Sequence, residues 1–270
     1  SLFRDHILDP VREGMKAPDQ GIPIPMPKLS KYTDYIEKGK IIVISGKSTS
    51  GKTSFMDHMY FMNVFMWWKN FEYEKDSKGK VKQDEDGKPI IDENAGKRPP
   101  LKMFYFNMKS SARLKLQKWL CLYLKLEFDT TIDIATLNSG VGRLYNLNQN
   151  HAAQIATALE FFEYMEDEVL TLITGEQTPT AIYNKVYNYM HEVGDVDETG
   201  TYLLKPENEG LITMMYIDNV EYMLSENDQF GMLNDEGIKK KIGNYARELK
   251  VKYGVTSFII SPSKSTFSRV

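Results

Sequence analysis

Two kinds of hydrophobic pattern alternate along this chain. Short, nearly continuous apolar runs rich in β-branched and aromatic residues are typical of buried strands; they lie at 40–45, 103–107, 211–217 and 256–261. Longer segments in which apolar residues recur every three or four positions predict helices; they lie at 52–71, 111–126, 150–173, 178–193 and 238–251. Strands that alternate with helices indicate an α/β domain with a mainly parallel central sheet flanked by helices. The run at 40–45 is expected to be a central strand covered on both faces.

The first 20 residues differ from the rest of the chain. Residues 3–16 have a helix-like pattern, and four prolines follow between 18 and 27. Proline and the residue before it resist helix, so this stretch predicts an extended connector. We therefore expect an N-terminal arm or linker helix over 1–20 and one domain over 21–270. The arm either packs on a neighbouring molecule or is a frayed terminal helix on its own domain.

Residues 72–100 form a charged excursion within the domain. They contain eight acidic and seven basic residues, and Asp86-Gly87 separates two short strand-like stretches. Asp-Gly between such stretches is a strong hairpin signal. We expect an inserted, solvent-exposed β-hairpin; nothing in the sequence names a partner for it.

Composition and charge exclude several classes of protein. A chain of 270 residues with 41% hydrophobic residues can bury a full core without disulfides. The single cysteine, Cys121, excludes a disulfide framework and a cysteine-based zinc site, and fits a reducing, cytoplasmic location. The net charge of −3 gives no overall basic field for nucleic acid. No membrane span is expected, because Asp57 and His58 interrupt the densest apolar stretch, and the first residues do not resemble a signal peptide.

A glycine-rich motif gives the clearest functional signal. Gly46-Lys47-Ser48-Thr49-Ser50-Gly51-Lys52-Thr53 fits G-x-x-x-x-G-K-[ST], follows a predicted strand and opens a predicted helix. The glycines let backbone N–H groups face phosphate oxygens, Lys52 reaches the β- and γ-phosphates, and the Thr53 hydroxyl is a ligand for Mg²⁺. The alternative is an ordinary Gly/Ser turn between strand and helix. The expected nucleotide-binding residues are Gly46, Lys47, Ser48, Thr49, Ser50, Gly51, Lys52, Thr53 and Ser54.

A carboxylate is needed to complete the magnesium shell of such a loop. Asp218 follows the apolar run 211–217 and would lie at the carboxyl end of a strand, where ligands collect in open α/β sheets. Alone, it could equally be a turn residue that caps the next helix. Beside a phosphate-binding loop, we expect it to hold Mg²⁺ with Thr53. Lys52 and Asp218 are the expected catalytic residues, with ATP and Mg²⁺ as ligands.

The motifs, taken in order, resemble a known family. Besides the loop at 46–53 they are Met103-Phe104-Tyr105-Phe106-Asn107-Met108, Thr178-Pro179-Thr180-Ala181-Ile182, Tyr216-Ile217-Asp218-Asn219-Val220 and Ile260-Ser261. From about residue 21 to 261 the chain resembles the RecA-type ATPase domain of DnaB-type replicative helicases, especially phage-encoded ones. The resemblance implies a RecA-like fold, ATP-driven translocation on single-stranded DNA, and a homo-oligomeric ring such as a hexamer. It also implies that residues 3–16 dock on the neighbouring protomer.

The chain departs from the family at positions that serve hydrolysis. The family's catalytic glutamate falls on Lys109, and its γ-phosphate-sensing glutamine falls on Pro262. Lysine cannot polarise the attacking water, so ATP could be held without being cleaved. Glu221 is a replacement base in principle, although such a residue more often caps a helix or faces solvent. Lys264 and Arg269 are the candidates left for an arginine finger.

Three functions stay open. The first is an active helicase motor, and the second is a degenerate relative that binds nucleotide structurally or regulatorily. The third is a recombinase or clock-type RecA relative, which would keep an acid at position 109. Other charged residues look structural; in particular Lys115, Lys118 and Lys125 interleave with apolar residues, and we expect them to snorkel along an amphipathic helix.

Overall fold

The computed structural model describes residues 21–26, 35–76, 80–138, 149–229 and 231–262. The predicted arm at 1–20 and the arginine-finger candidates Lys264 and Arg269 lie outside these residues. The central sheet has five parallel strands in the order β3-β11-β8-β4-β5. Their bounds are β3 (Ile41–Gly46), β4 (Leu101–Asn107), β5 (Leu170–Thr174), β8 (Ile212–Asp218) and β11 (Thr256–Pro262). The predicted parallel α/β sheet is therefore confirmed.

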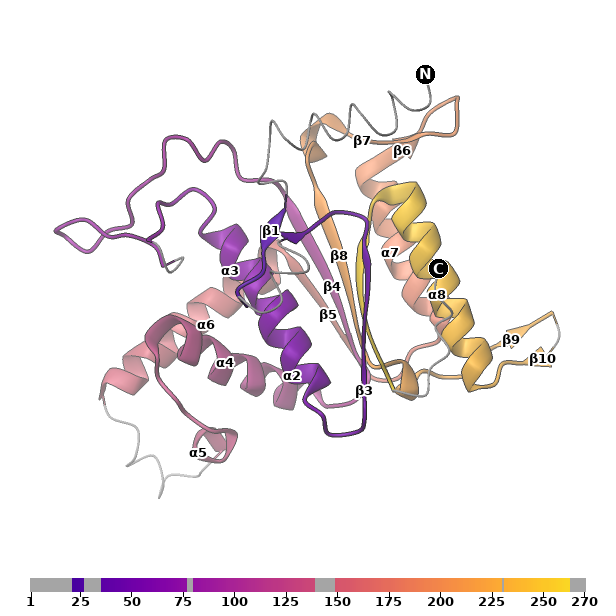
Figure 1. Ribbon diagram of the computed structural model, residues 1–270, viewed down its shortest axis with the longest axis horizontal. Helices are drawn as coiled ribbons and strands as arrows, with labels where there is room; N and C mark the ends of the chain where they lie inside the picture. Colours follow the sequence, from indigo (N-terminus) through magenta and orange to yellow (C-terminus); the bar gives the residue numbers. More distant parts are fainter. Residues whose placement is uncertain (1–20, 27–34, 77–79, 139–148, 230, 263–270) are drawn as a thin grey trace.

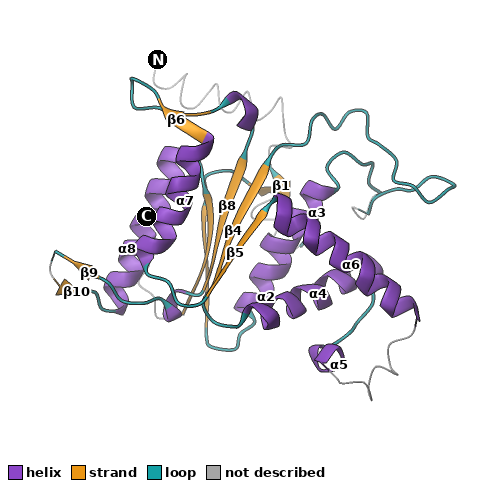
Figure 2. Cartoon of the chain, turned by 180° about the vertical axis from the view of Figure 1, so that it is seen from behind, coloured by secondary structure: helices purple, strands orange, loops and turns teal. Residues whose placement is uncertain are grey.

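Helices cover both faces of the sheet and make three layers (Figures 1 and 2). One face packs against the continuous helical segment of α2 (Lys52–Met56), η2 (Asp57–Met62) and α3 (Asn63–Lys69), and against α4 (Ala112–Phe128) and α6 (Gln149–Glu168). The other face packs against α7 (Pro179–Val193) and α8 (Asp235–Tyr253). Neighbouring strand residues point to opposite faces: Tyr216 of β8 lies in the first core cluster and Ile217 in the second.

Smaller elements decorate this core. Three antiparallel pairs are β1 (Ile22–Pro23) with β2 (Tyr35–Ile36), β6 (Gly194–Val196) with β7 (Tyr202–Leu204), and β9 (Asn227–Asp228) with β10 (Gly231–Met232). Short helices are α5 (Ile134–Asn138), η4 (Pro206–Asn208) and η5 (Val220–Tyr222). No helix of the described residues is both long and apolar enough to cross a membrane.

Strand β3 corrects one expectation. The prediction of a central strand covered on both faces is wrong, because within the described sheet β3 pairs only with β11 and forms an edge. Its partial burial reflects this position, and Val43 is 37% exposed. A continuous β-branched run looks the same in a central and an edge strand, so hydrophobicity alone could not distinguish them.

Strand β5 also differs from the predicted elements. The helical pattern expected over 150–173 ends at Glu168 in α6, and residues 170–174 form a parallel strand beside β4. No glycine or proline separates the two elements. The apolar residues of β5 therefore read as a continuation of the helix.

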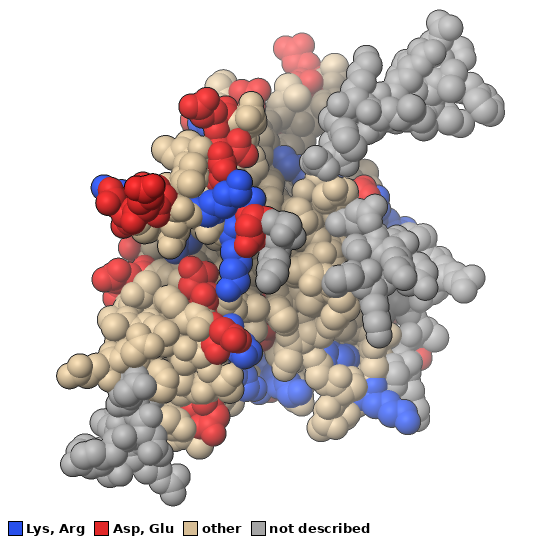
Figure 3. All heavy atoms as spheres, turned by 60° about the vertical axis from the view of Figure 1, so that its left-hand side comes forward, with Lys and Arg blue, Asp and Glu red and all other residues tan. Residues whose placement is uncertain are grey.

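The charged segment 72–100 is an antiparallel excursion, as predicted. Isolated bridges pair Tyr73 with Ile91 and Gln83 with Pro89. The Asp84 side chain accepts a hydrogen bond from Lys88 N at 2.8 Å and closes the predicted Asp-Gly turn. The segment projects away from the sheet beyond α3 (Figures 1 and 2). Acidic and basic side chains are intermixed on the face shown in Figure 3.

Candidate nucleotide and metal site

The glycine-rich loop joins the end of β3 to the start of α2. Gly51 has φ +80°, a conformation that favours glycine, and a Cβ on Gly46 would lie 2.9 Å from Ser50 Oγ. Lys52 Nζ donates hydrogen bonds to Gly46 O at 2.8 Å and to Lys47 O at 2.7 Å. The lysine therefore lies along the loop, and the helix that begins at Lys52 directs its first N–H groups toward the same space.

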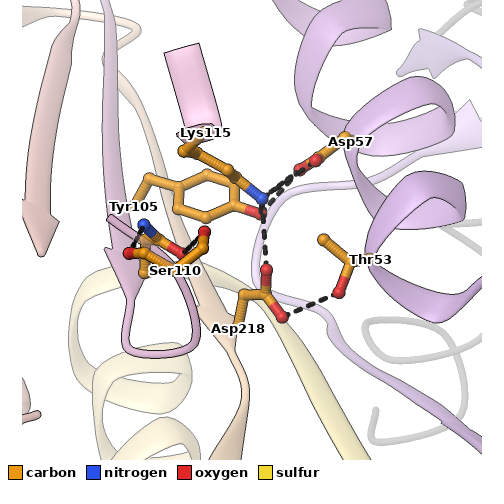
Figure 4. Close-up of polar contacts among 7 residues, drawn as sticks. Thr53, Asp57, Tyr105, Ser110, Lys115 and Asp218 are labelled. Atoms are coloured by element: carbon orange, nitrogen blue, oxygen red, sulfur yellow. Dashed lines mark hydrogen bonds and ion pairs between the residues drawn. The ribbon is translucent and has the colours of Figure 1, made fainter. Parts of the chain in front are cut away.

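The structure brings Thr53 and Asp218 together across 165 residues of sequence. Thr53 Oγ1 donates to Asp218 Oδ1 at 2.9 Å (Figure 4). Asp218 is the last residue of β8, and its side chain follows those of Met214 and Tyr216 on the face that packs against α2. The loop hydroxyl and the strand-end carboxylate that were expected to share Mg²⁺ are therefore in direct contact.

A buried lysine contacts the other oxygen of this carboxylate. Lys115 Nζ lies 3.1 Å from Asp218 Oδ2 and 2.9 Å from Asp57 Oδ2 (Figure 4). It also donates to the hydroxyl of Tyr105, which itself donates to Asp57 Oδ1 at 2.6 Å. The three ammonium protons thus have three acceptor groups, as a buried cation requires.

Lys115 corrects the expectation that it snorkels along an amphipathic helix. Only 1% of the residue is exposed, and its ammonium lies 4.3 Å from the centre of the Tyr105 ring. Sequence reasoning also missed Asp57, which is 3% exposed. The sequence feature that could have identified Asp57 is its place as an isolated acid within the apolar pattern of residues 54–68. Buried acids are rare unless they are paired, so such an acid indicates a buried partner. The pattern did not identify the partner.

Strand register assembles this cluster. Tyr105 pairs with Tyr216, and Asn107 pairs with Asp218, so the Tyr105 and Asp218 side chains lie on one face of neighbouring strands. Helices η2 and α4 cover that face and supply Asp57 and Lys115. Four elements therefore contribute to one polar cluster inside an aromatic core.

The charges of the cluster do not cancel. Two carboxylates, Asp57 and Asp218, surround one ammonium, Lys115, which leaves one negative charge when all are ionised. Burial raises the pKa of Asp57, although the Lys115 charge and the Tyr105 hydrogen bond favour its ionised form. Burial also raises the pKa of Tyr105, so its hydroxyl stays protonated near neutral pH. With both carboxylates ionised, this surplus negative charge would favour a cation beside Asp218.

The donor atoms fit magnesium. Thr53 Oγ1 and Asp218 Oδ1 are hard oxygen atoms at the mouth of the loop, and Mg²⁺ prefers such oxygens together with substrate phosphates. The loop residues expected to bind nucleotide lie next to them, from Gly46 to Ser54 along β3 and α2. The chemistry of the residues present is compatible with a nucleotide and its metal.

The positions that depart from the family pattern lie at the carboxyl ends of the parallel strands, as the loop and Asp218 do. Lys109 is exposed just after β4, in a turn closed by Asn107 Nδ2 donating to Ser110 O at 2.6 Å. Pro262 is in register with Gly46. Glu221 is exposed and lines a small pocket with Lys239 and Pro262. The structure thus places Glu221 toward solvent beside α8 and leaves no acid at position 109.

Comparisons with known proteins define the fold. No protein-family model matches this sequence, and no curated protein matches it either. The solved structure of a DnaB-like replicative helicase, described with its interactions with primase, is similar with 12% identity and a TM-score of 0.54. The match covers 95% of this chain and 48% of that one, so this chain spans about half its length. A KaiC-like protein from the archaeon Pyrococcus horikoshii OT3 is similar with 11% identity, a TM-score of 0.43, and coverage of 92% and 74%. Together with the strand topology, the helicase match shows that this chain has a DnaB-type RecA-like fold.

Proposed function

We propose that this chain binds ATP together with Mg²⁺ at the carboxyl ends of β3 and β8. The observation that carries the proposal is the contact of Thr53 with Asp218 at the mouth of a complete glycine-rich loop. The cluster behind Asp218 has two carboxylates for one ammonium, which supports a cation there. An ordinary Gly/Ser turn would require neither the loop lysine nor this carboxylate.

Each residue has a distinct task in the proposed site. The backbone N–H groups of residues 46–51 and the Lys52 ammonium would bind the phosphate oxygens. Thr53 and Asp218 would hold the metal. When bound, Mg²⁺ supplies positive charge that neutralises the phosphates. Ser54, the third residue of α2, would add its N–H group at the positive end of the helix dipole.

We further propose that the site belongs to a helicase-type motor. The likeness in fold to a DnaB-like replicative helicase supports this, as does the order of the sequence motifs. In this proposal residues 21–270 are one ATPase domain, residues 1–20 form an arm, and the chain assembles into a homo-oligomeric ring in the cytoplasm. The ring would move on single-stranded DNA by cycles of ATP hydrolysis.

A nucleotide titration tests the binding site. A fluorescent ATP analogue should bind the unaltered chain, and Lys52→Ala should weaken binding by about a hundredfold, because hydrogen bonds to a charged group contribute roughly 3 kcal/mol. Lys125→Ala is the matched control, since Lys125 on α4 is exposed and pairs with Asp129, the residue after the helix. Equal affinities of the unaltered chain and Lys52→Ala would contradict the proposed site.

A second function is favoured by Lys109. With a cation in place of the family's glutamate, the chain would hold ATP as a structural or regulatory ligand and turn it over slowly. Steady-state hydrolysis with and without single-stranded DNA separates the two proposals. DNA-stimulated turnover supports the motor, whereas tight binding without turnover supports the nucleotide-holding relative.

A further inference from the structure

Lys115 lies directly behind the proposed metal ligand. Its ammonium contacts Asp218 Oδ2 at 3.1 Å, while Thr53 contacts Oδ1 of the same carboxylate at 2.9 Å. Asp218 is therefore held from both sides, with one oxygen toward the loop and one toward the core (Figure 4). The residue is 1% exposed, so these two contacts fix its orientation inside the core.

Asp57 shares the same cation. Lys115 Nζ lies 3.0 Å and 2.9 Å from the two Asp57 oxygens, closer than to Asp218. The rings of Tyr105 and Trp119 enclose the ammonium at 4.3 Å and 5.4 Å from their centres. Asp57 and Asp218 are the carboxylates that face the ammonium among the described residues, so its charge is divided between them.

We propose that Lys115 is a positioning residue that orients Asp218 and sets how much Mg²⁺ the nucleotide site requires. This inference rests on the proposed nucleotide and metal site. A fixed ammonium on Oδ2 offsets part of the negative charge that attracts the metal to Oδ1. In the low dielectric of the core, such a nearby charge acts much more strongly than it would in water.

The arrangement predicts opposite effects for two related variants. Asp57→Asn leaves the ammonium with Asp218 as its one charged partner, so the cation offsets more of the Asp218 charge and Mg²⁺ binds less well. Lys115→Met/Asp57→Asn removes the cation together with the carboxylate that would otherwise be stranded. Asp218 then keeps its full charge, and Mg²⁺ binds better.

The experiment measures the Mg²⁺ concentration that half-saturates binding of a fluorescent, non-hydrolysable ATP analogue. We expect this concentration to rise about threefold or more in Asp57→Asn and to fall about threefold or more in the double variant. Lys125→Met, an exposed lysine on the same helix, should leave it unchanged. Loss of packing alone would shift the half-saturating Mg²⁺ concentration of both core variants in the same direction. A shift in the same direction in both variants therefore overturns the proposal. An unchanged Mg²⁺ requirement also overturns it.

A measurement on the unaltered chain does not depend on whether the variants fold. The ¹⁵N resonance of the buried Lys115 ammonium should shift when Mg²⁺ is added to the complex with the analogue. Analogue without metal should leave it in place. A Lys115 ammonium resonance that does not shift when Mg²⁺ is added overturns the proposal.

Different outcomes would contradict the proposed function and the role of Lys115. If the unaltered chain binds no nucleotide at any Mg²⁺ concentration, the proposed function is wrong and the inference falls with it. If nucleotide binds in all variants with one Mg²⁺ requirement, the proposed site stands and Lys115 does not tune it.

Discussion

Two residues with opposite charge, Asp57 and Lys115, determine the character of the site. Each stands in a predominantly apolar helical pattern, and they are 58 residues apart in sequence. A buried ion pair of this kind is stable only when its hydrogen bonds are complete. Tyr105 provides the additional donor and acceptor that complete them. At the scale of single residues, buried polar side chains of the core therefore contact the candidate site directly, through Lys115 and Asp218.

Removing the Tyr105 hydroxyl should destabilise the protein. Tyr105→Phe deletes one hydrogen bond to Asp57 and one acceptor of Lys115 inside the core. We expect a loss of about 1–3 kcal/mol in the free energy of unfolding, measured by urea denaturation. Tyr164→Phe is the control, because its ring stacks on Trp68 at the edge of the core. Equal losses in both variants would contradict a special role for the Tyr105 hydroxyl.

Position 109 should control turnover. Lys109→Glu places a carboxylate on the exposed turn next to Met108, whose N–H donates to Asp218 O at 2.8 Å. A carboxylate there can orient and polarise water, which lysine cannot. We expect ATP turnover to rise about tenfold or more, since a positioned general base typically contributes at least that much. A rate equal to or below that of the unaltered chain would show that this position is not the lost base.

At the scale of elements, helix ends follow local chemistry closely. Helix α4 begins after Ser111, whose side chain accepts a hydrogen bond from Leu114 N at 3.3 Å. Helix α7 begins with Pro179 after Thr178, which caps Ala181 N at 3.1 Å. Both starts agree with the helical patterns predicted from residues 111 and 178, and each capping contact lies within one turn of the helix. The end of α6 was not predicted, since β5 follows it without a turn residue.

The cap of α4 can be tested directly. Ser111→Ala should lower the free energy of unfolding by about 1 kcal/mol, because one N–H group of the first turn loses its acceptor. Ser111→Asp keeps an acceptor and adds a negative charge at the helix start, so it should retain the stability. Chemical denaturation of the three chains measures the difference. Equal stability of the alanine and aspartate variants would show that the cap contributes nothing.

Glu226 should make part of the stability depend on pH. Burial by itself would raise its pKa, but hydrogen bonds from Lys241 and Thr180 outweigh burial, and the pKa is lowered below 4.5. The ionised form is thus favoured in the folded state. Its contribution is complete above the pKa of the unfolded chain and is lost as the pH falls through the lower pKa of the folded chain.

Glu226→Gln tests this contribution. The variant should lose about 1 kcal/mol of unfolding free energy at pH 7. Its stability should also decline less steeply than that of the unaltered chain between about pH 5 and 3. Urea denaturation across this range provides the measurement. Parallel pH profiles would contradict the assignment.

At the scale of the whole molecule, the sheet and the charged insertion are separate structures. The backbone hydrogen bonds of residues 72–92 connect this segment largely to itself. At its end, Trp68 Nε1 donates to Pro99 O at 2.6 Å, and Arg98 lies 4.4 Å from the Trp68 ring centre. These contacts return the chain to the core next to β4. We therefore expect the sheet not to depend on what lies between the two ends of the insertion.

Shortening the insertion should therefore preserve the domain. Residues 75–89 can be replaced by Asn-Gly, which closes a tight hairpin between the paired ends near Tyr73 and Ile91. We expect the melting temperature to change by less than about 4 °C, and the affinity for nucleotide to stay the same. Circular dichroism melting and the ATP-analogue titration check this. A large fall in either would show that the insertion supports the core or the site.

The sequence by itself determined what depends on neighbouring residues. The loop at 46–53, the caps of α4 and α7, the Asp-Gly turn and four of the five central strands follow from patterns within a few positions. Tertiary structure decided what depends on strand order and on distant partners. It made β3 an edge, separated β5 from α6, and brought Lys115 from the predicted surface of a helix to Asp57 and Asp218. The physical reason is that a pattern along the chain records whether a position is buried, whereas the compensation of a buried charge depends on groups that only the folded sheet brings together.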